Sequence, residues 1–422
     1  MDEAQRLNDI LARELPLVER CLSPVGRRAA FPRGIPYQTA EAKNSEINAT
    51  IGQVTVGLGD PLPLPAMLNA AQGLDPKMVF LYSPQEGHAA LRDAWAARQR
   101  AQSNRCLKLT SLPMVAHGIT QAISLVAEMF GDETATVVIP DPCWENYELM
   151  FGLRPRAPIV RYAFVGEGRL NVESFERALA AAPPGGKVIA LINLPANPNG
   201  YTPTSAEVAQ LVDVICSHPG PLVVLFDDAY QGMVWEHGLM PRSPFWDVLE
   251  KHDPERCFPI KVDGATKELL FFGGRIGFLT HAATGAAEAA VLSKLKCIVR
   301  ATSGVESGPS QALVLRALQD PGLDTAIAER MAVLRRRYIA LKEALAALTT
   351  DRLRPFPFNS GVFALLGLPP ELDAEAFRRK LLVEHSVGVI SVPSVNAIRV
   401  AYCSVEEAWI PELVRRMERA VM

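Results

Sequence analysis

Residues 260–275 read IKVDGATKELLFFGGR, a strand-like run followed by an exposed turn that carries Lys267, with Arg275 eight positions further on. Short residues precede the lysine, so its amine can be desolvated enough to lose its proton. A neutral amine can attack a carbonyl and form a Schiff base. The forked guanidinium of an arginine suits a phosphate group. A lone lysine is more often a solvated surface residue, so this interpretation depends on the rest of the chain.

Composition and charge exclude several classes of protein. With 422 residues, the chain is long enough for one large and one smaller domain. The net charge of −3 argues against a nucleic-acid or anionic membrane surface. We find no apolar run of the roughly 18 residues that a membrane span needs, and no visible signal peptide. Seven scattered cysteines indicate reduced thiols rather than disulfides or a zinc site. We expect a soluble cytoplasmic protein without a metal.

From about residue 85, apolar runs alternate with helical patterns. The runs are short and continuous, which is typical of strands buried on both faces of a parallel sheet. The expected strands are residues 136–140, 188–192, 222–226 and 275–280. The expected helices around them are residues 86–101, 119–130, 205–217 and 285–297. This alternation predicts an α/β fold with an open, mostly parallel sheet.

The pattern changes at both ends of the chain. A helix is expected from the N-terminus through Val18. After about Pro321, helices at 324–348 and 374–384, strands at 361–366 and 398–402, and a last helix to Val421 predict a smaller α+β domain. We expect an N-terminal arm and part of the small domain in residues 1–58. The large domain should span residues 59–320 and the C-terminal small domain residues 321–422.

Polar side chains follow the predicted strands where each strand ends. Asp227 and Tyr230 follow one strand, Asn197 lies in an Asn-Pro turn after another, and Trp144 follows a third. In open α/β sheets, ligands bind at the carboxyl ends of the strands. His117 to Thr120 opens a helix, where free N–H groups can bind an anion. We therefore expect these side chains to meet around one anionic ligand.

Several motifs occur in the order found in one known family. The chain resembles fold-type I enzymes that depend on pyridoxal 5′-phosphate (PLP), of the class I/II aminotransferases, and is nearest in pattern to aspartate aminotransferase. The resemblance runs from about Asn48 to Tyr402. It implies a mostly parallel seven-stranded sheet flanked by helices in the large domain, plus a smaller α+β domain. The motifs are Tyr82-Ser83-Pro84-Gln85-Glu86-Gly87, Pro142-Cys143-Trp144-Glu145-Asn146, Asn197-Pro198-Asn199-Gly200, Asp227 with Tyr230, Lys267 with Arg275, and Arg399.

The resemblance implies roles around the cofactor ring. Lys267 would hold PLP as an internal aldimine and later shuttle a proton. Asp227 would pair with the pyridine nitrogen, although a strand-end aspartate can also be a helix cap. Tyr230 and Asn197 would bind the phenolate oxygen, although Asn197 also fits a plain turn. Trp144 would stack on the ring, the alternative being a core indole.

Further implied roles concern the phosphate and the quaternary structure. Gly118, Ile119 and Thr120 would surround the phosphate together with Arg275. Tyr82 resembles a residue that reaches the phosphate from a neighbouring subunit, so the resemblance implies a homodimer with shared active sites. The alternative for Tyr82 is an ordinary surface or core position.

The substrate is expected to be recognised through its carboxylates. Arg399 resembles the arginine that binds the α-carboxylate. Arg300 falls where the aspartate enzyme binds a distal carboxylate, but it equally fits a salt-bridged helix end. Ile35 lies in a segment in the position of that enzyme's substrate gate. Two departures count against a plain aspartate enzyme: Gly264 replaces a serine that donates to the phosphate, and Glu306 adds an acid near Arg300.

These features predict a PLP-dependent aminotransferase. It would move the amino group of a dicarboxylic amino acid, such as aspartate or glutamate, to a 2-oxo acid through an aldimine and a quinonoid. The alternative is a specialised biosynthetic enzyme of the same fold that performs β/γ-elimination or replacement, decarboxylation or carbon–carbon bond formation. A dinucleotide-binding dehydrogenase is disfavoured, because residues 273–277 lack the Gly-x-Gly-x-x-Gly spacing.

Overall fold

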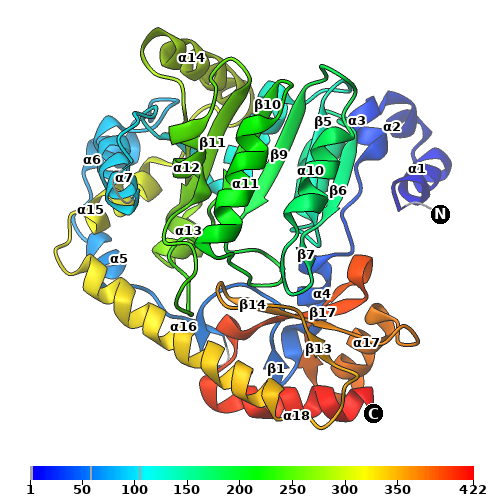
Figure 1. The fold of residues 1–422 in the computed structure, drawn as a ribbon. Helices are drawn as coiled ribbons and strands as arrows, with labels where there is room; N and C mark the ends of the chain where they lie inside the picture. The colour runs from blue at the N-terminus through cyan, green and yellow to red at the C-terminus, as the bar shows by residue number, and fades with distance from the viewer. Residues whose placement is uncertain (1–2, 58, 104–105) are drawn as a thin grey trace.

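The computed structural model describes residues 3–57, 59–103 and 106–422. A seven-stranded sheet lies at the centre of the larger part of the molecule (Figure 1). Among these strands β12 alone runs antiparallel to its neighbours, so the expectation of a mostly parallel seven-stranded sheet is confirmed. The order across the sheet is β4 (Met114–His117), β12 (Ile276–His281), β11 (Cys257–Gly264), β10 (Leu222–Asp227), β9 (Val188–Asn193), β5 (Thr136–Asp141) and β6 (Ile159–Ala163).

Both faces of the sheet are covered by helices. Along β10, Leu222, Val224 and Phe226 face one apolar core, while Val223 and Leu225 face another. Each fully buried side chain of this kind stabilises the fold by about 1.5–3 kcal/mol. The first core is closed by α10 (Val172–Ala180), α11 (Ser205–Ser217) and α12 (Pro244–Lys251). The second is closed by α8 (Gly118–Phe130) and α14 (Gly285–Thr302), with α9 (Asn146–Gly152) beside them.

A further group of helices packs at the β4–β12 edge. Phe278 of β12 stacks on Trp95, with ring centroids 4.2 Å apart. The same core takes side chains from α15, which contacts α5, α6 and α7. This group consists of α5 (Pro65–Ala70), α6 (Pro76–Phe80), α7 (Ala89–Gln102) and α15 (Gly308–Leu318).

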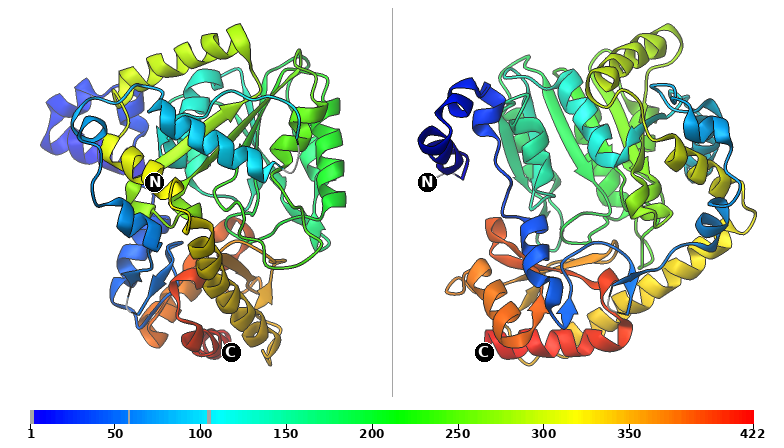
Figure 2. Two further views of the ribbon diagram at one scale, coloured as in Figure 1. Left: turned by 90° about the vertical axis from the view of Figure 1, so that its left-hand side faces the viewer. Right: turned by 180° about the vertical axis from the view of Figure 1, so that it is seen from behind.

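The smaller part is built on a four-stranded antiparallel sheet below the large one (Figures 1 and 2). Its order is β13 (Arg354–Pro355), β14 (Phe363–Gly367), β17 (Ala397–Ala401) and β16 (Ile390–Val392). Three helices accompany it: α16 (Leu323–Ala346), α17 (Ala374–His385) and α18 (Ile410–Val421). In addition, β1 (Ile47–Asn48) pairs with β15 (Val387–Gly388), so an early segment joins the C-terminal part. The exact domain boundaries stay a prediction, and residue 58 lies outside the described residues.

The N-terminal arm differs from the expectation. A single helix through Val18 is wrong: α1 (Glu3–Glu14) ends before Pro16, and α2 (Pro16–Cys21) and α3 (Pro24–Arg28) follow. Proline lacks a backbone N–H and its ring clashes with the preceding helical turn, so the first helix stops there. The arm lies beside the β5–β6 side of the large sheet (Figures 1 and 2).

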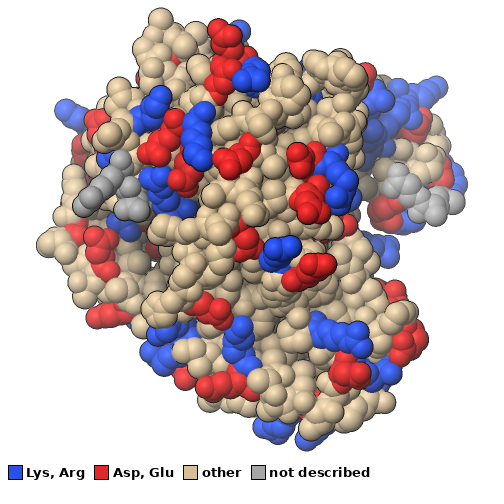
Figure 3. Space-filling model, viewed as in Figure 1, with Lys and Arg blue, Asp and Glu red and all other residues tan. Residues whose placement is uncertain are grey.

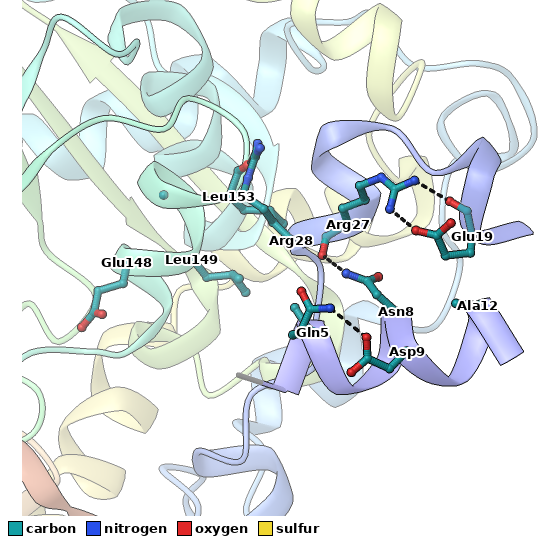
Figure 4. Close-up of a pocket in the computed structure, with 12 residues that line it drawn as sticks. Gln5, Asn8, Asp9, Ala12, Glu19, Arg27, Arg28, Glu148, Leu149 and Leu153 are labelled. Atoms are coloured by element: carbon teal, nitrogen blue, oxygen red, sulfur yellow. Dashed lines mark hydrogen bonds and ion pairs between the residues drawn. The ribbon is translucent and has the colours of Figure 1, made fainter. Parts of the chain in front are cut away.

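A hollow of about 600 Å³ separates the arm from α9 (Figure 4). Two pairs of its polar side chains interact with each other: Gln5 donates to Asp9, and Arg27 is ion-paired with Glu19. Arg28 Nη2 donates to the carbonyl of Leu153 at 2.8 Å and so ties the arm to the body. Arg28 Nε is buried without a partner among the described residues, whereas these other polar contacts are made within the arm or to its neighbour.

The surface adds two observations. Acidic and basic side chains are interspersed over the face shown in Figure 3. Within the described ranges, no helix combines the length and the apolar character needed to cross a membrane.

Candidate active site

A cavity of about 200 Å³ opens where the carboxyl ends of β9 and β10 face the small sheet. Its walls come from both parts of the molecule, because β14 and β17 of the small sheet contribute as well. Of the residues selected from the sequence, those that line the cavity are Ile35, Ile119, Thr120, Trp144, Asn197, Asp227, Tyr230, Lys267, Arg275 and Arg399. The structure thus brings together side chains that are far apart in the sequence, since Ile35 and Arg399 are separated by 364 positions (399 − 35 = 364).

Lys267 does not lie on an exposed turn, as the sequence predicted, but on the short helix α13 (Ala265–Glu268) inside the molecule. Its Nζ donates to the carbonyl oxygen of Gly52 at 2.8 Å. The rings of Phe272 and Tyr230 lie 4.8 and 5.5 Å from Nζ. Burial lowers the pKa of Lys267 to about 8, so a substantial fraction of the amine is neutral near that pH.

Three glycines bring the start of α8 against β12 and Arg275. A Cβ atom on Gly264 would lie 2.6 Å from the carbonyl oxygen of Ile276, and one on Gly277 would lie 2.6 Å from the amide of Ile119. Gly118 has φ +73°, and a Cβ there would lie 2.5 Å from Arg275 Nη2. The guanidinium and the N-terminal amides of a thirteen-residue helix therefore converge, which creates an anion-binding position.

Asp227 is buried at the end of β10 with its carboxylate toward the cavity. Tyr147 Oη donates to Oδ2 at 2.5 Å, and the Ala229 amide donates to Oδ1 at 3.1 Å. Burial raises the pKa of Asp227 to about 6, and the hydrogen bond from Tyr147 opposes that rise. Asp227 is therefore ionised above about pH 6 and ready to hold a protonated nitrogen.

Arg399 is held rigidly at the opposite end of the cavity. Its Nη2 donates to the Thr50 carbonyl at 2.7 Å, and its Nη1 donates to Asn197 Oδ1 at 3.3 Å. The guanidinium lies 4.4 Å from the centre of the Phe363 ring. Its Nε is buried and has no hydrogen-bond partner among the described residues. A buried donor without a partner is costly, so a carboxylate that accepts from it would be bound favourably.

Two of the selected residues lie away from this cavity. Tyr82 is 94% exposed. Arg300, near the end of α14, is also exposed and has no ion-pair partner within the described ranges. Glu306 does not pair with Arg300: it accepts a hydrogen bond from Ser303 at 2.8 Å and lies 3.9 Å from His117 Nδ1. A single chain therefore leaves Tyr82 and Arg300 free for contacts beyond itself.

Sequence reasoning missed several residues of the cavity. Tyr147 could have been found, because it lies one helical turn after Trp144, and the two rings meet edge to face at 5.5 Å. Asn193 Oδ1 accepts from the Asn197 amide at 2.8 Å and fixes that turn. Thr266 and Phe363 also line the cavity, but no local pattern marks them. Within the described ranges, no group of three or more His, Cys, Asp or Glu side chains could hold a metal ion.

Comparisons with known proteins agree with this geometry. The model of the family "Aminotransferase class I and II" matches residues 45–417. A probable N-succinyldiaminopimelate aminotransferase of Mycobacterium tuberculosis is 28% identical, over 85% of this chain and 86% of that protein. A mitochondrial aspartate aminotransferase of Dictyostelium discoideum is 26% identical, over 85% of each. A solved aspartate aminotransferase of Thermus thermophilus with maleate has the same fold (TM-score 0.77, 21% identity, 94% and 99% covered).

Proposed function

The chain belongs to the aminotransferase class I and II family, and on that premise we propose that it moves the amino group of a dicarboxylic amino acid to a 2-oxo acid as a homodimer with shared active sites. The family is PLP-dependent, and its members are transferases. One observation carries the proposal for this chain: a single cavity joins Lys267, Asp227, Arg275 and Arg399. These four side chains match the amine, the nitrogen partner, the phosphate partner and the carboxylate partner that the reaction needs.

The donor set of the cavity fits PLP. Arg275 and the amides at the start of α8 provide the phosphate position, where a side chain at Gly118 would leave no room. The Thr266 hydroxyl is buried without a partner among the described residues and lines the same cavity. Asp227 suits the pyridine nitrogen, and Tyr230 and Asn197 suit the ring oxygen. When bound, PLP supplies an electron sink for the carbanion formed at the substrate Cα.

Lys267 does the proton work in this proposal. Its lowered pKa leaves a fraction of the amine neutral, so Lys267 would hold the cofactor and would accept the proton from the substrate Cα. Asp227 keeps the ring nitrogen protonated, which it can do because Tyr147 and the Ala229 amide stabilise its charge. Trp144 and Phe363 contribute apolar walls that exclude water from the reacting atoms.

Arg399 is proposed to bind the substrate α-carboxylate. Its two hydrogen bonds leave Nε free and fix the plane of the guanidinium, so the carboxylate is held in one orientation. Ile35, at the start of α4 (Ile35–Glu41), also lines the cavity. The carbonyl oxygen of Thr50 and the side-chain oxygen Oδ1 of Asn197, which accept from Arg399, would thus act on the substrate through it.

Arg300 of a second copy is proposed to bind the distal carboxylate. The side chain is exposed and unpaired within the described ranges, and Glu306 does not neutralise it. The relatives support an acidic donor, because one is named for aspartate and another for N-succinyldiaminopimelate. The exposed apolar segment Phe80, Leu81 and Tyr82, exposed by 83%, 64% and 94%, supports a dimer interface that carries Tyr82 to the neighbouring site.

We also place the enzyme in the cytoplasm. Its seven cysteines are all unpaired, which is typical of a reducing compartment.

The test is a single-turnover reaction without an acceptor. PLP-loaded protein is mixed separately with aspartate, glutamate, leucine and phenylalanine, and pyridoxamine phosphate and the keto acid are quantified by chromatography. We expect fast, stoichiometric conversion with the acidic donors and slow conversion with the neutral ones. Lys267→Ala should give no conversion. Equal rates for acidic and neutral donors would remove the dicarboxylate assignment, and loss of carbon dioxide or ammonia instead of amine transfer would favour a specialised lyase.

A further inference from the structure

Glu268 is a buried acid next to Lys267 that has no part in the chemistry described above. It is 7% exposed, and burial raises the pKa of its carboxyl group. Its partners are Arg98, whose Nε donates to Oε1 at 2.5 Å, and Gln102, whose Nε2 donates to the same oxygen at 2.8 Å. A buried carboxylate is tolerated when it is paired and hydrogen-bonded, and both conditions hold here.

Asp263, on the other side of Lys267, is bound by the same helix. Trp95 Nε1 donates to its Oδ1 at 2.9 Å, and Gln99 Nε2 donates to its Oδ2 at 2.9 Å. Asp263 is 1% exposed. Thus α7 donates hydrogen bonds to the acid that precedes the Lys267 turn, which is also ion-paired with Lys261, as well as to the acid that follows it.

The four side chains of α7 follow a helical repeat. Positions 95, 98, 99 and 102 are spaced as i, i+3, i+4 and i+7, which places them on one face of the helix. That face is directed at residues 263–268. Arg98 Nη1 also donates to Asp324 Oδ1 at 3.0 Å, so the start of α16 joins the same cluster.

A helix as short as α13 needs such external support. It has four residues and no side-chain cap at its N-terminus. One hydrogen-bonded turn does not repay the entropy of ordering its residues, so an isolated helix of this length is unstable. Its backbone must be fixed from outside, and a displacement of about 1 Å in a reacting group can cost about 100-fold in rate.

We propose that this polar face of α7, through the ion pair of Arg98 with Glu268, positions Lys267 for reaction with the cofactor. Arg98 and Glu268 touch neither the cavity nor the substrate, so they are positioning residues. The proposal rests on the role given above to Lys267, but its main readout needs no cofactor.

The experiment measures the Lys267 amine directly. Cofactor-free full-length protein is acylated with a small amine-reactive ester at a series of pH values, and modification of the peptide that contains Lys267 is followed by mass spectrometry. In parallel, the rate of PLP capture is followed by absorbance. The variants are Arg98→Met, which removes the ion pair, and Arg98→Lys, which keeps a cation. Arg378→Met is the control, because Arg378 is also charged, is 1% exposed and pairs with Glu375 and Glu41, and none of these three side chains lines the cavity.

We expect Arg98→Met to slow PLP capture by roughly 10- to 100-fold and to move the acylation midpoint upward, toward that of an ordinary lysine. Arg98→Lys should retain most of the wild-type behaviour. Arg378→Met should lower the melting temperature but leave the midpoint and the capture rate unchanged.

An Arg98→Met protein with a lower melting temperature but the wild-type acylation midpoint and PLP capture rate would show that the ion pair serves stability alone. That result would overturn the proposal. If Arg98→Met does not fold, Glu268→Gln replaces it, because the amide keeps the shape and loses the charge. A smaller shift in the same direction is then expected, and no shift would overturn the proposal. Failure of the proposed function is distinguishable, since Lys267→Ala would then capture PLP as the wild type does.

Discussion

At the scale of single residues, the buried carboxylate of Asp227 lowers the stability of the cofactor-free protein, and the proposed pairing with the cofactor's ring nitrogen would offset this loss. Its pKa is raised from 3.8 to about 6, so the empty protein loses stability as the pH rises through this interval, and the full cost of about 3 kcal/mol is present above pH 6. Asp227→Asn removes the charge, and the Tyr147 hydroxyl can accept from an amide as well as donate. We expect cofactor-free Asp227→Asn to melt higher than the wild type at pH 8, with the gain shrinking toward pH 4. Equal melting temperatures at pH 8 would contradict this account. With PLP added, the order should reverse.

Thr266 is the second residue whose environment predicts a measurable effect. Its hydroxyl is buried and unpaired on the wall of the cavity that Arg275 also lines, and Gly264 offers no side chain to the phosphate. A hydrogen bond to a charged group contributes about 1.5–3 kcal/mol. Thr266→Val should therefore weaken PLP binding by roughly 10- to 100-fold in a fluorescence titration, while Thr266→Ser should bind nearly as the wild type. Identical affinities for the valine and serine variants would show that the hydroxyl does not reach the phosphate.

At the scale of elements, the close approach of β11 to β12 explains why Gly264 replaces the serine of the aspartate enzyme. A Cβ at Gly264 meets the Ile276 carbonyl at 2.6 Å and the Gly277 Cα at 2.8 Å, and both are backbone atoms that cannot turn aside. Gly264→Ser should therefore lower stability by about 1–3 kcal/mol in urea unfolding rather than improve PLP binding. Gly273→Ser is the matched control, because nothing lies within 4 Å of a Cβ there. Similar free energies of unfolding for the two variants would mean that β11 and β12 can move apart without loss of stability.

Helices and strands with a strong hydrophobic periodicity were predictable from the sequence. Elements whose position depends on tertiary contacts were not. Helix α11 begins and ends where expected, because a Thr204–Glu207 capping box marks its start. The strands β4 and β6 were missed: β4 has four residues, and β6 lies at the sheet edge, where Arg161 interrupts the apolar run. The interior position of Lys267 also went unpredicted, because Phe272 and the Gly52 segment that bury it come from tertiary contacts.

Much of the candidate site was predictable for a related reason. Polar residues that follow apolar strands stand out in a sequence, and Asp227, Asn197 and Trp144 all do so. Asn193 carries the same signal, because it directly follows the expected strand 188–192, and it was overlooked. Phe363 lies within a strand that resembles ordinary core, so its place in the cavity becomes visible only when the two sheets are assembled.

At the scale of the whole molecule, one chain brings together the groups proposed to bind the cofactor, but its cavity offers no further cation for the proposed distal carboxylate. The cavity is lined by Lys267, Arg275 and Arg399, each of which already has a role, while Arg300 and Tyr82 face outward. A closed two-fold dimer would repeat any contact twice, so that each chain lends Arg300 to the other's cavity. The sites would then be interdependent, which a mixed dimer can reveal.

The decisive variant pair is Lys267→Ala with Arg300→Met. Each homodimer should be poor with aspartate: the first lacks the reactive amine in both sites, and the second should lose at least about tenfold in kcat/KM for acidic donors because it lacks a charged hydrogen bond. If Arg300 acts across the interface, a heterodimer purified with two different tags has one site with both defects and one intact site. Its activity with aspartate should then reach about half that of the wild type. If Arg300 acts within its own chain, every site of the heterodimer carries one defect, and the activity stays at the level of the homodimeric variants. Leucine serves as the control donor, since Arg300→Met should leave its rate unchanged.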